Sequence, residues 1–262
     1  MPEHHNPFKV LDPVPSKAPV EPENRLLVVC DNISLKGDLR SSWAFSCLIK
    51  LQGRSILFDT GADPQTLLGN MDRLSVEPEK IDAIVISHAH ADHAGGLGGL
   101  LDYRRDFVIY LPASFPMSVK KELGALGLQV EEVERPVMIH PGVHSTGELG
   151  EGIKEQGIVI ETSKGLVVIT GCAHPGIVRM VRRALEISKD RIYLLLGGFH
   201  LMGESLETIR SIAGELTRAG VKRIAPCHCT GDEPKAFFKE YFGDNHIACG
   251  VGTDLTIPPL SG

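Results

Sequence analysis

The sequence is poor in aromatic side chains and has no excess of positive charge. Phe, Tyr and Trp make up 5% of the 262 residues, and there is one tryptophan. A core must therefore rest mainly on aliphatic residues, which are abundant enough to bring the hydrophobic fraction to 42%. Lys and Arg number 27 against 33 Asp and Glu, a net charge of −6. Because nucleic-acid binding needs a concentrated basic face, we expect no nucleic-acid partner.

Long apolar runs and a leader-like beginning are also missing. No stretch approaches the roughly 18 apolar residues of a membrane span, and no charged-then-apolar signal opens the chain. We therefore expect a cytoplasmic protein without a membrane partner. In such a protein the cysteines are thiols or metal ligands rather than disulfides. The six are Cys30, Cys47, Cys172, Cys227, Cys229 and Cys249.

The first 24 residues differ in composition from the rest. They contain six prolines and little apolar periodicity. This composition predicts an extended arm over residues 1–24, ahead of one catalytic domain over residues 25–262. His4 and His5 lie in this arm, and we interpret them as solvated tail residues.

From Leu26 onward, short apolar runs alternate with segments of helical periodicity. The predicted strands are Leu26–Cys30, Ala44–Leu51, Ser55–Asp59, Ala83–Ser87, Phe107–Leu111, Gln129–Glu132, Gly157–Thr162, Gly165–Thr170, Arg191–Leu196, Arg223–Ala225 and Ile247–Ala248. The predicted helices are Pro64–Met71, Gly96–Tyr103, Pro116–Leu126, Pro175–Ser188, Ser205–Ala219 and Pro234–Phe242. Two passages resemble hairpins, Ser46–Phe58 and Ile158–Ile169. The mixture predicts an α/β protein in which two mixed β-sheets pack face to face between helices.

One cluster of ligand-type side chains follows a predicted buried strand. His88, His90, Asp92 and His93 lie within six residues. Two residues apart on an extended chain, His88 and His90 point the same way and can hold one ion. Asp92 and His93 lie where a helix begins and can address a second ion. Imidazole and carboxylate suit zinc best, with manganese or iron as alternatives, so the run predicts two divalent metal ions.

This run resembles the HxHxDH motif of the metallo-β-lactamase superfamily. The resemblance implies an αββα sandwich with the metals at one edge of the sheets. It also implies that Asp59, in the preceding Leu57–Gly61 segment, supports the metal ligands by hydrogen bonding. His174, in Gly-Cys-Ala-His-Pro-Gly, would complete the three-histidine set of the first ion. His228, in Pro-Cys-His-Cys-Thr-Gly, would be the last ligand of the second ion.

The chain departs from the superfamily pattern at one ligand position. Many members carry an aspartate that bridges both metals where this chain has Cys172, so Cys172 is either a bridging thiolate or a small buried residue. Cys227 and Cys229 flank His228, and strand alternation would turn both away from the metals. Members also carry a histidine near Gly142–Gly147, where this chain offers His144. We interpret His140, His144 and His246 as incidental.

His200 follows the predicted strand Arg191–Leu196 within Gly-Gly-Phe-His-Leu. In a loop at the rim of the site it can bind substrate or transfer a proton, and a structural imidazole is the alternative. Asp92 and His200 are therefore the predicted catalytic residues. All other predicted site residues are ligands or support ligands.

The motifs together resemble one branch of the superfamily, labelled 7,8-dihydropterin-6-yl-methyl-4-(β-D-ribofuranosyl)aminobenzene 5′-phosphate synthase, over about residues 25–255. That resemblance implies condensation of a pterin with loss of pyrophosphate. The site itself favours a hydrolase that cleaves a phosphoester or related ester with a metal-activated water. A non-catalytic metal or ligand sensor on the same fold is the third hypothesis. Under all three hypotheses the expected partner is a small anionic molecule. Whether the protein forms a homodimer is left open by the sequence.

Overall fold

The computed structural model describes residues 24–261. Its strands are β1 (Arg25–Cys30), β2 (Ser46–Leu51), β3 (Arg54–Phe58), β4 (Ala83–Val85), β5 (Val108–Pro112), β6 (Gln129–Val133), β7 (Val137–His140), β8 (Val143–Ser145), β9 (Ile158–Thr162), β10 (Gly165–Thr170), β11 (Ile192–Gly198), β12 (Arg223–Cys227) and β13 (Asp254–Thr256). Its helices are α1 (Pro64–Arg73), α2 (Ala91–Ala94), α3 (Leu97–Leu100), α4 (Met117–Ala125), α5 (Ile177–Ile187), α6 (Leu206–Arg218) and α7 (Asp232–Phe242), with the 3₁₀ turns η1 (Pro78–Lys80), η2 (His228–Thr230) and η3 (Gly243–Asn245). The predicted arm over residues 1–24 lies outside the described residues, apart from Asn24.

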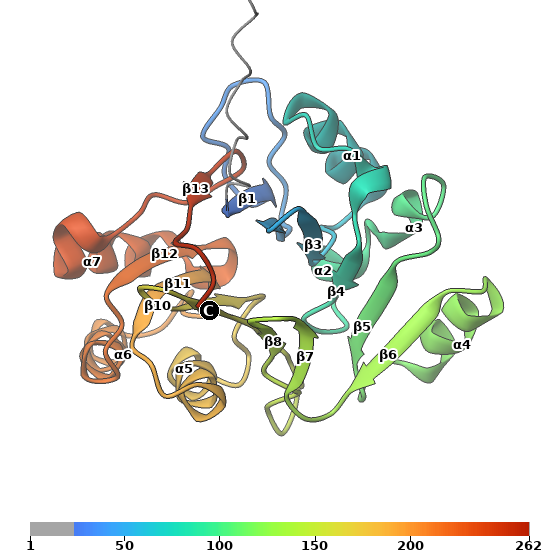
Figure 1. The fold of residues 1–262 in the computed structure, drawn as a ribbon. Coiled ribbons are helices and arrows are strands. Elements are labelled where there is room, and N and C mark those ends of the chain that lie inside the picture. The colour runs from blue at the N-terminus through green and yellow to red at the C-terminus, as the bar shows by residue number, and fades with distance from the viewer. Residues whose placement is uncertain (1–23, 262) are drawn as a thin grey trace, which may run out of the picture.

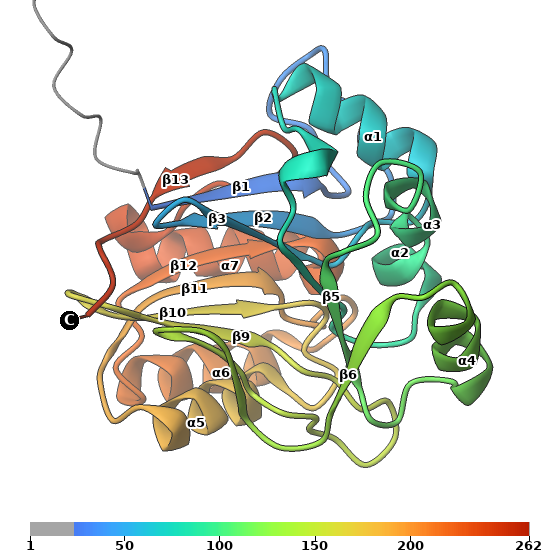
Figure 2. The same cartoon turned by 45° about the vertical axis from the view of Figure 1, so that its right-hand side comes forward.

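Two mixed sheets pack face to face with helices on both outer faces, as the sequence predicted. One sheet has the order β13-β1-β2-β3-β4-β5-β6 and the other β12-β11-β10-β9-β8-β7. Helices α1 to α4 lie on the side of the first sheet and α5 to α7 on the side of the second (Figures 1 and 2). Both predicted hairpins are present, because β2 pairs antiparallel with β3 and β9 with β10.

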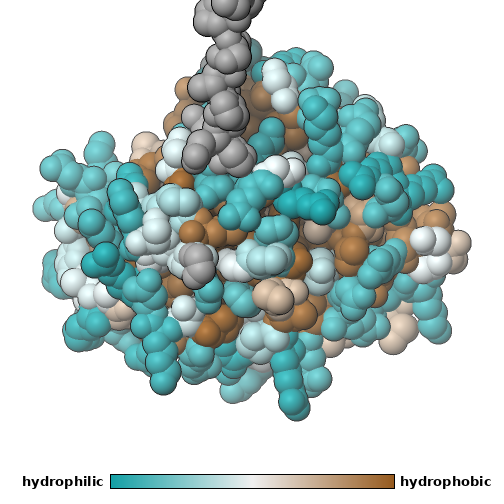
Figure 3. All heavy atoms as spheres, viewed as in Figure 1, coloured by the Kyte–Doolittle hydropathy of each residue, from teal (hydrophilic) through white to brown (hydrophobic). Residues whose placement is uncertain are grey.

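Three apolar clusters hold these layers together. In β10, Val167 and Ile169 belong to the cluster between the sheets, whereas Leu166 and Val168 belong to the cluster under α5, α6 and α7. A strand covered on both faces must be apolar throughout, which explains its continuous run of Leu, Val and Ile. The hydrophilic side chains gather outside, where they cover most of the face seen in Figure 3. Among residues 24–261, no helix is long and apolar enough to cross a membrane.

The prediction of a strand at Ile247–Ala248 was wrong. The chain there passes beside β12 and makes only an isolated bridge, between His246 and Ile224. Conversely, β7, β8 and β13 were not predicted. They are three or four residues long, too short for alternation to identify, and β7 is half exposed. Strand β13 exists because it pairs with β1 at the start of the described chain.

The parallel strands direct their carboxyl ends to one edge of the sandwich. Strands β3, β4 and β5 run parallel in the first sheet, and β10, β11 and β12 run parallel in the second. Loops that follow such strands commonly form the binding crevice of α/β proteins. All the predicted site residues lie in these loops or in the short helix α2.

Candidate metal centre

Four ligand-type side chains follow strand β4. His88 lies in a bend just after the strand, His90 is the residue just before α2, and Asp92 and His93 lie within α2. His88 and His93 are fully buried, and His88 Nε2 lies 3.1 Å from His90 Nδ1. The bend after β4 and the helical turn that follows it therefore bring all four side chains to one place.

A first ligand group combines His88 and His90 with His174. The potential ligand atoms of these three residues all lie within 4.8 Å of one another. His174 comes from the loop between β10 and α5, so the group joins the two sheets. This is the set that the sequence assigned to the first ion.

A second ligand group consists of Asp92, His93 and His228, whose ligand atoms also lie within 4.8 Å of one another. Asp92 Oδ2 lies 3.3 Å from His228 Nε2 and 3.5 Å from His93 Nε2. Although burial raises it, the two imidazoles hold the pKa of Asp92 at about 2. Asp92 is thus a carboxylate at neutral pH, as a metal ligand must be.

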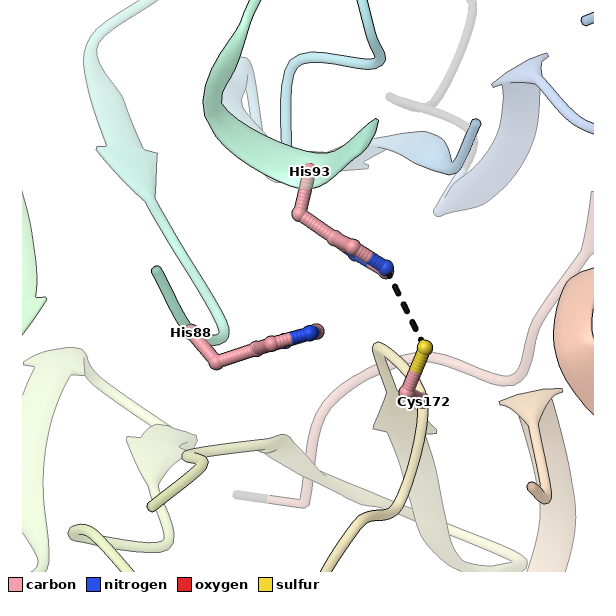
Figure 4. A group of neighbouring side chains, drawn as sticks. All are labelled: His88, His93 and Cys172. Atoms are coloured by element: carbon pink, nitrogen blue, oxygen red, sulfur yellow. Dashed lines mark hydrogen bonds between the residues drawn. The ribbon is translucent and has the colours of Figure 1, made fainter. Parts of the chain in front are cut away.

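Cys172 lies between the two groups. Its Sγ is 3.3 Å from His93 Nε2, and the three side chains in Figure 4, His88, His93 and Cys172, point toward one another from α2 and the ends of β4 and β10. The same thiol forms further clusters, one with His174 and His200 and one with His228 and Cys229. Cys172 is therefore buried close to both groups, and its assignment as a bridging thiolate or as a small packed residue stays a prediction.

Asp59 lies directly under His93. Its Oδ2 is 2.7 Å from His93 Nδ1, and its carboxylate also accepts hydrogen bonds from the Ser87 main-chain N–H at 2.6 Å and from the Ser87 hydroxyl at 2.7 Å. With Nδ1–H donated to Asp59, the Nε2 lone pair of His93 is free for an ion. The predicted supporting role of Asp59 matches this geometry.

His228 is held by two residues that the sequence analysis missed. Asn32 Oδ1 lies 3.0 Å from His228 Nδ1, and Asn32 Nδ2 donates to the His228 carbonyl oxygen at 3.0 Å. Asp31 accepts the main-chain N–H of His228 at 2.8 Å. The available signal was the polar pair Asp31-Asn32 directly after a predicted strand, but its partner is almost two hundred residues away.

A buried carboxylate supports the Cys172–His174 loop and was also missed. Glu155 is fully buried. Burial raises its pKa to about 7, although the main-chain N–H groups of Ala173 and His174 oppose the shift. Nothing in the sequence around Glu155 marks it, since it lies in an irregular polar segment.

The prediction that Cys229 turns away from the metals was wrong. Its ligand atom clusters with those of Cys172 and His228. Strand β12 ends at Cys227, and the chain then enters the 3₁₀ turn η2, so strand alternation no longer applies. Cys227 does lie away from the site, in the core between the sheets. The hydrogen bond with Cys172, and the nearby His200, lower the pKa of Cys229 to about 5.

His200 lies at the rim beside the first group. Its ring centroid is 4.3 Å from that of His174, and its side chain is exposed. The other three histidines belong to none of the ligand groups found among the described residues. These are His140, His144 and His246.

The donor set fits divalent ions. Nε2 of His174 and Nε2 of His228 are buried and make no hydrogen bond within the described chain, although Asp92 lies close to the latter. Burial lowers the pKa of His174 to about 4 and also lowers that of His88, so both imidazoles are neutral with free lone pairs. Neutral imidazoles beside a carboxylate are the ligands that zinc, manganese and iron take.

The chain belongs to the metallo-β-lactamase superfamily, whose family model matches residues 44–228. Within it, the chain is 32% identical over 254 residues to the 7,8-dihydropterin-6-methyl-4-(β-D-ribofuranosyl)-aminobenzene-5′-phosphate synthase of Methanocaldococcus jannaschii, covering 78% of this chain and 86% of that protein. This relative bears the label that the motifs indicated. Ribonuclease Z of Nanoarchaeum equitans is 31% identical over 91 residues, only 28% of that protein.

Solved structures agree with the fold. A crystal structure of a metal-dependent hydrolase of the β-lactamase superfamily superposes with a TM-score of 0.75 at 28% identity, covering 90% of this chain and 99% of that one. Human tRNase Z, short form, superposes with a TM-score of 0.61 at 15% identity, over 89% of this chain and 99% of that one. At that identity the likeness concerns the fold alone.

Proposed function

We propose that the protein is a metal-dependent hydrolase that holds two divalent ions, zinc first, and cleaves a phosphoester or related ester of a small anionic molecule. The observation that carries this proposal is the pair of three-residue ligand groups with Cys172 between them. His88, His90 and His174 would hold one ion, and Asp92, His93 and His228 the other. When bound, two such ions lower the pKa of a water and neutralise charge on the reacting oxygens.

The residues at the rim suit an anionic substrate. A cavity of about 400 Å³ opens beside His174, and its lining includes Gly150, Gly152, the basic Arg179 and one acidic residue, Glu151. Helix α5 begins there with no capping side chain and no acidic residue in its first turn, so its amide end favours an anion. The imidazole of His200 would lie next to the substrate and donate a proton to the leaving oxygen.

A pterin-conjugate synthase is the second candidate, and one observation favours it. The synthase of Methanocaldococcus jannaschii is similar to this chain over 86% of its own length. Condensation with loss of pyrophosphate would use the same ligand groups to hold the leaving phosphates. A sensor is the third candidate, and the complete set of ligand-type side chains weighs against it.

Elemental analysis of the purified protein together with a substrate panel would test this proposal. We expect about two metal ions per chain and turnover of a phosphomonoester or phosphodiester. Thioesters, lactones, and a dihydropterin pyrophosphate donor supplied together with an aromatic ribosyl phosphate as its acceptor complete the panel. Condensation of the pterin donor without ester hydrolysis would replace the hydrolase with the synthase, and bound metal without turnover of any compound would favour the sensor.

A further inference from the structure

A single carboxylate receives four main-chain N–H groups of the loop that follows β10. Glu155 Oε1 accepts from Gly171 at 3.1 Å, from Cys172 at 3.0 Å and from Ala173 at 2.9 Å. Its Oε2 accepts from His174 at 2.9 Å. All four hydrogen bonds converge on the segment that carries two candidate ligands, so one side chain fixes the main chain of that segment.

This loop has a backbone conformation that needs support. Ala173, between Cys172 and His174, has a φ of 60°. A residue with a Cβ atom is unfavourable in this left-handed region, because the Cβ approaches the carbonyl oxygen. The conformation nevertheless sends the two flanking side chains into the same site, so something outside the loop must stabilise it.

The segment that carries Glu155 also contacts the other ligand-bearing loop. Gln156 donates its main-chain N–H to the Ser87 carbonyl oxygen at 2.9 Å, next to His88. Its side-chain amide donates to the Ile86 carbonyl oxygen at 2.8 Å. Glu155 itself forms two 2.9 Å main-chain hydrogen bonds with Leu149, which fix its own position. Residues 155 and 156 therefore join the end of β4 to the end of β10.

We propose that Glu155 is a positioning residue of the metal centre: its carboxylate holds residues 171–174 in the conformation that aims Cys172 and His174 at the ions. Through Gln156 the same short segment sets the distance between His88 and His174, which come from different sheets. The consequence for metal affinity rests on the proposed metal binding. The consequence for the loop itself does not, because the hydrogen bonds are made by the protein alone.

Glu155→Gln is the first variant to test, because the amide keeps the size of the side chain but replaces one of the two accepting oxygens with an NH2 group, which cannot accept. We expect the main-chain amides of Cys172, Ala173 and His174 to exchange hydrogen faster in the metal-free protein. We expect the affinity for one ion to fall by about 10–100-fold, the usual effect of removing a group that orients a ligand. Chelator competition with Zn²⁺ measures the affinity, and hydrogen exchange measures the loop.

Adding Ala173→Gly to Glu155→Gln tests whether the loss of Zn²⁺ affinity comes from the conformation of the loop. If Glu155 only stabilised the fold as a whole, this second substitution would restore no affinity. Glycine adopts positive φ without a steric penalty, so the loop needs less support. The double variant Glu155→Gln with Ala173→Gly should recover part of the lost Zn²⁺ affinity, while Ala173→Gly alone should bind like the wild type. Glu148→Gln is the control. Glu148 also accepts a main-chain N–H, from Ser114 at 2.9 Å, and pairs with Lys154 at 2.7 Å, next to Glu155, so this variant measures the effect of losing a neighbouring carboxylate that donates nothing to and accepts nothing from the Cys172–His174 loop.

The proposal would be overturned if Glu155→Gln had the same amide hydrogen-exchange rates in the loop and the same Zn²⁺ affinity as the wild type. If Glu155→Gln does not fold, Glu155→Asp decides instead, because its shorter carboxylate cannot reach all four N–H groups. Zn²⁺ affinity equal to the wild type in Glu155→Asp would then overturn it. A wild-type protein that binds no metal would end the proposed function, while the exchange rates would still test the loop.

Discussion

His93, His228 and His174 are held in place by different contacts. A carboxylate, Asp59, accepts from the ring of His93, whereas an amide oxygen, that of Asn32, lies against the ring of His228. The main chain of His174 is held instead of its ring. A carboxylate makes an imidazole a stronger donor to a metal than an amide does, so His93 should be the more basic ligand of the second group.

The metal content of two alanine variants should distinguish the role of Asp92 from that of His200. Asp92→Ala should release one ion, because it removes the carboxylate of the second group, and should slow the reaction by a thousandfold or more, at about 1.4 kcal/mol per decade. His200→Ala should keep both ions and lose about 10²–10⁴ in rate with a changed pH profile. Metal analysis and the pH dependence of kcat check both variants. Loss of metal in His200→Ala with both ions kept in Asp92→Ala would contradict the assignment.

Trp43 should report on the second group. It is the one tryptophan of the chain, its side chain is half exposed, and its ring centroid lies 5.2 Å from that of His228. Co²⁺ bound at His228 would be close enough to quench its fluorescence. We expect quenching on titration of the metal-free protein, and little in His228→Ala. Equal quenching in both proteins would show that Co²⁺ binds elsewhere.

Helices α2 and α3 approach the first sheet very closely, and glycines allow it. A Cβ atom on Gly96 would lie 2.0 Å from the carbonyl oxygen of Thr60. The main-chain N–H of Thr60 also donates to the carbonyl oxygen of His93, at 2.6 Å. The helical turn that carries two candidate ligands thus lies directly on the turn after β3. Any side chain at position 96 would push these two elements apart.

Gly96→Ala should therefore destabilise the protein, by about 1–3 kcal/mol as for other overpacked sites, and reduce its metal content. Gly98→Ala is the matched control, because a Cβ there would meet nothing within 4 Å. Since Gly98 lies in α3, alanine should leave stability unchanged or raise it by up to about 1 kcal/mol. Denaturant unfolding and metal analysis of both variants decide this. Equal stability of the two would mean that the backbone moves to accommodate the methyl group.

For the whole molecule, the ligand groups lie where the two sheets meet. His88 to His93 follow a strand of the first sheet, whereas Cys172, His174 and His228 follow strands of the second. Bound ions would tie the sheets together, and a ligand that binds only the folded state stabilises it. At 100 times its dissociation constant one ion contributes about 2.7 kcal/mol.

Removing the metals with a chelator should lower Tm by about 5–10 °C for each ion lost at this size. Scanning calorimetry with and without the chelator measures the shift. The same chelator should shift a variant that lacks both His174 and His228 much less. A shift of equal size in that variant would mean that the stabilising ions are bound outside these groups.

The fold was predictable where a segment is buried on both sides of a sheet. Continuous apolar runs such as β10 follow directly from composition, and the two-layer arrangement follows from the alternation of hairpins and strand–helix units. Short strands such as β7 and β13 could not be predicted. Strand β7 has only four residues and pairs with the still shorter β8, and β13 depends on pairing with β1 at the other end of the described chain. The position of Cys229 was mispredicted for a related reason, because alternation fails where β12 gives way to η2.

The sequence by itself determined the HxHxDH run and its order along the chain, because four ligand-type side chains within six residues need no tertiary contact to be noticed. Only the tertiary structure decided which groups orient them. Cys172 meets His93 across 79 residues, and Asn32 meets His228 across 196. Glu155 holds a loop 16 to 19 residues further along the chain. Such contacts leave no local pattern in the sequence. They form only when the two sheets pack together, and that packing depends on the whole apolar core.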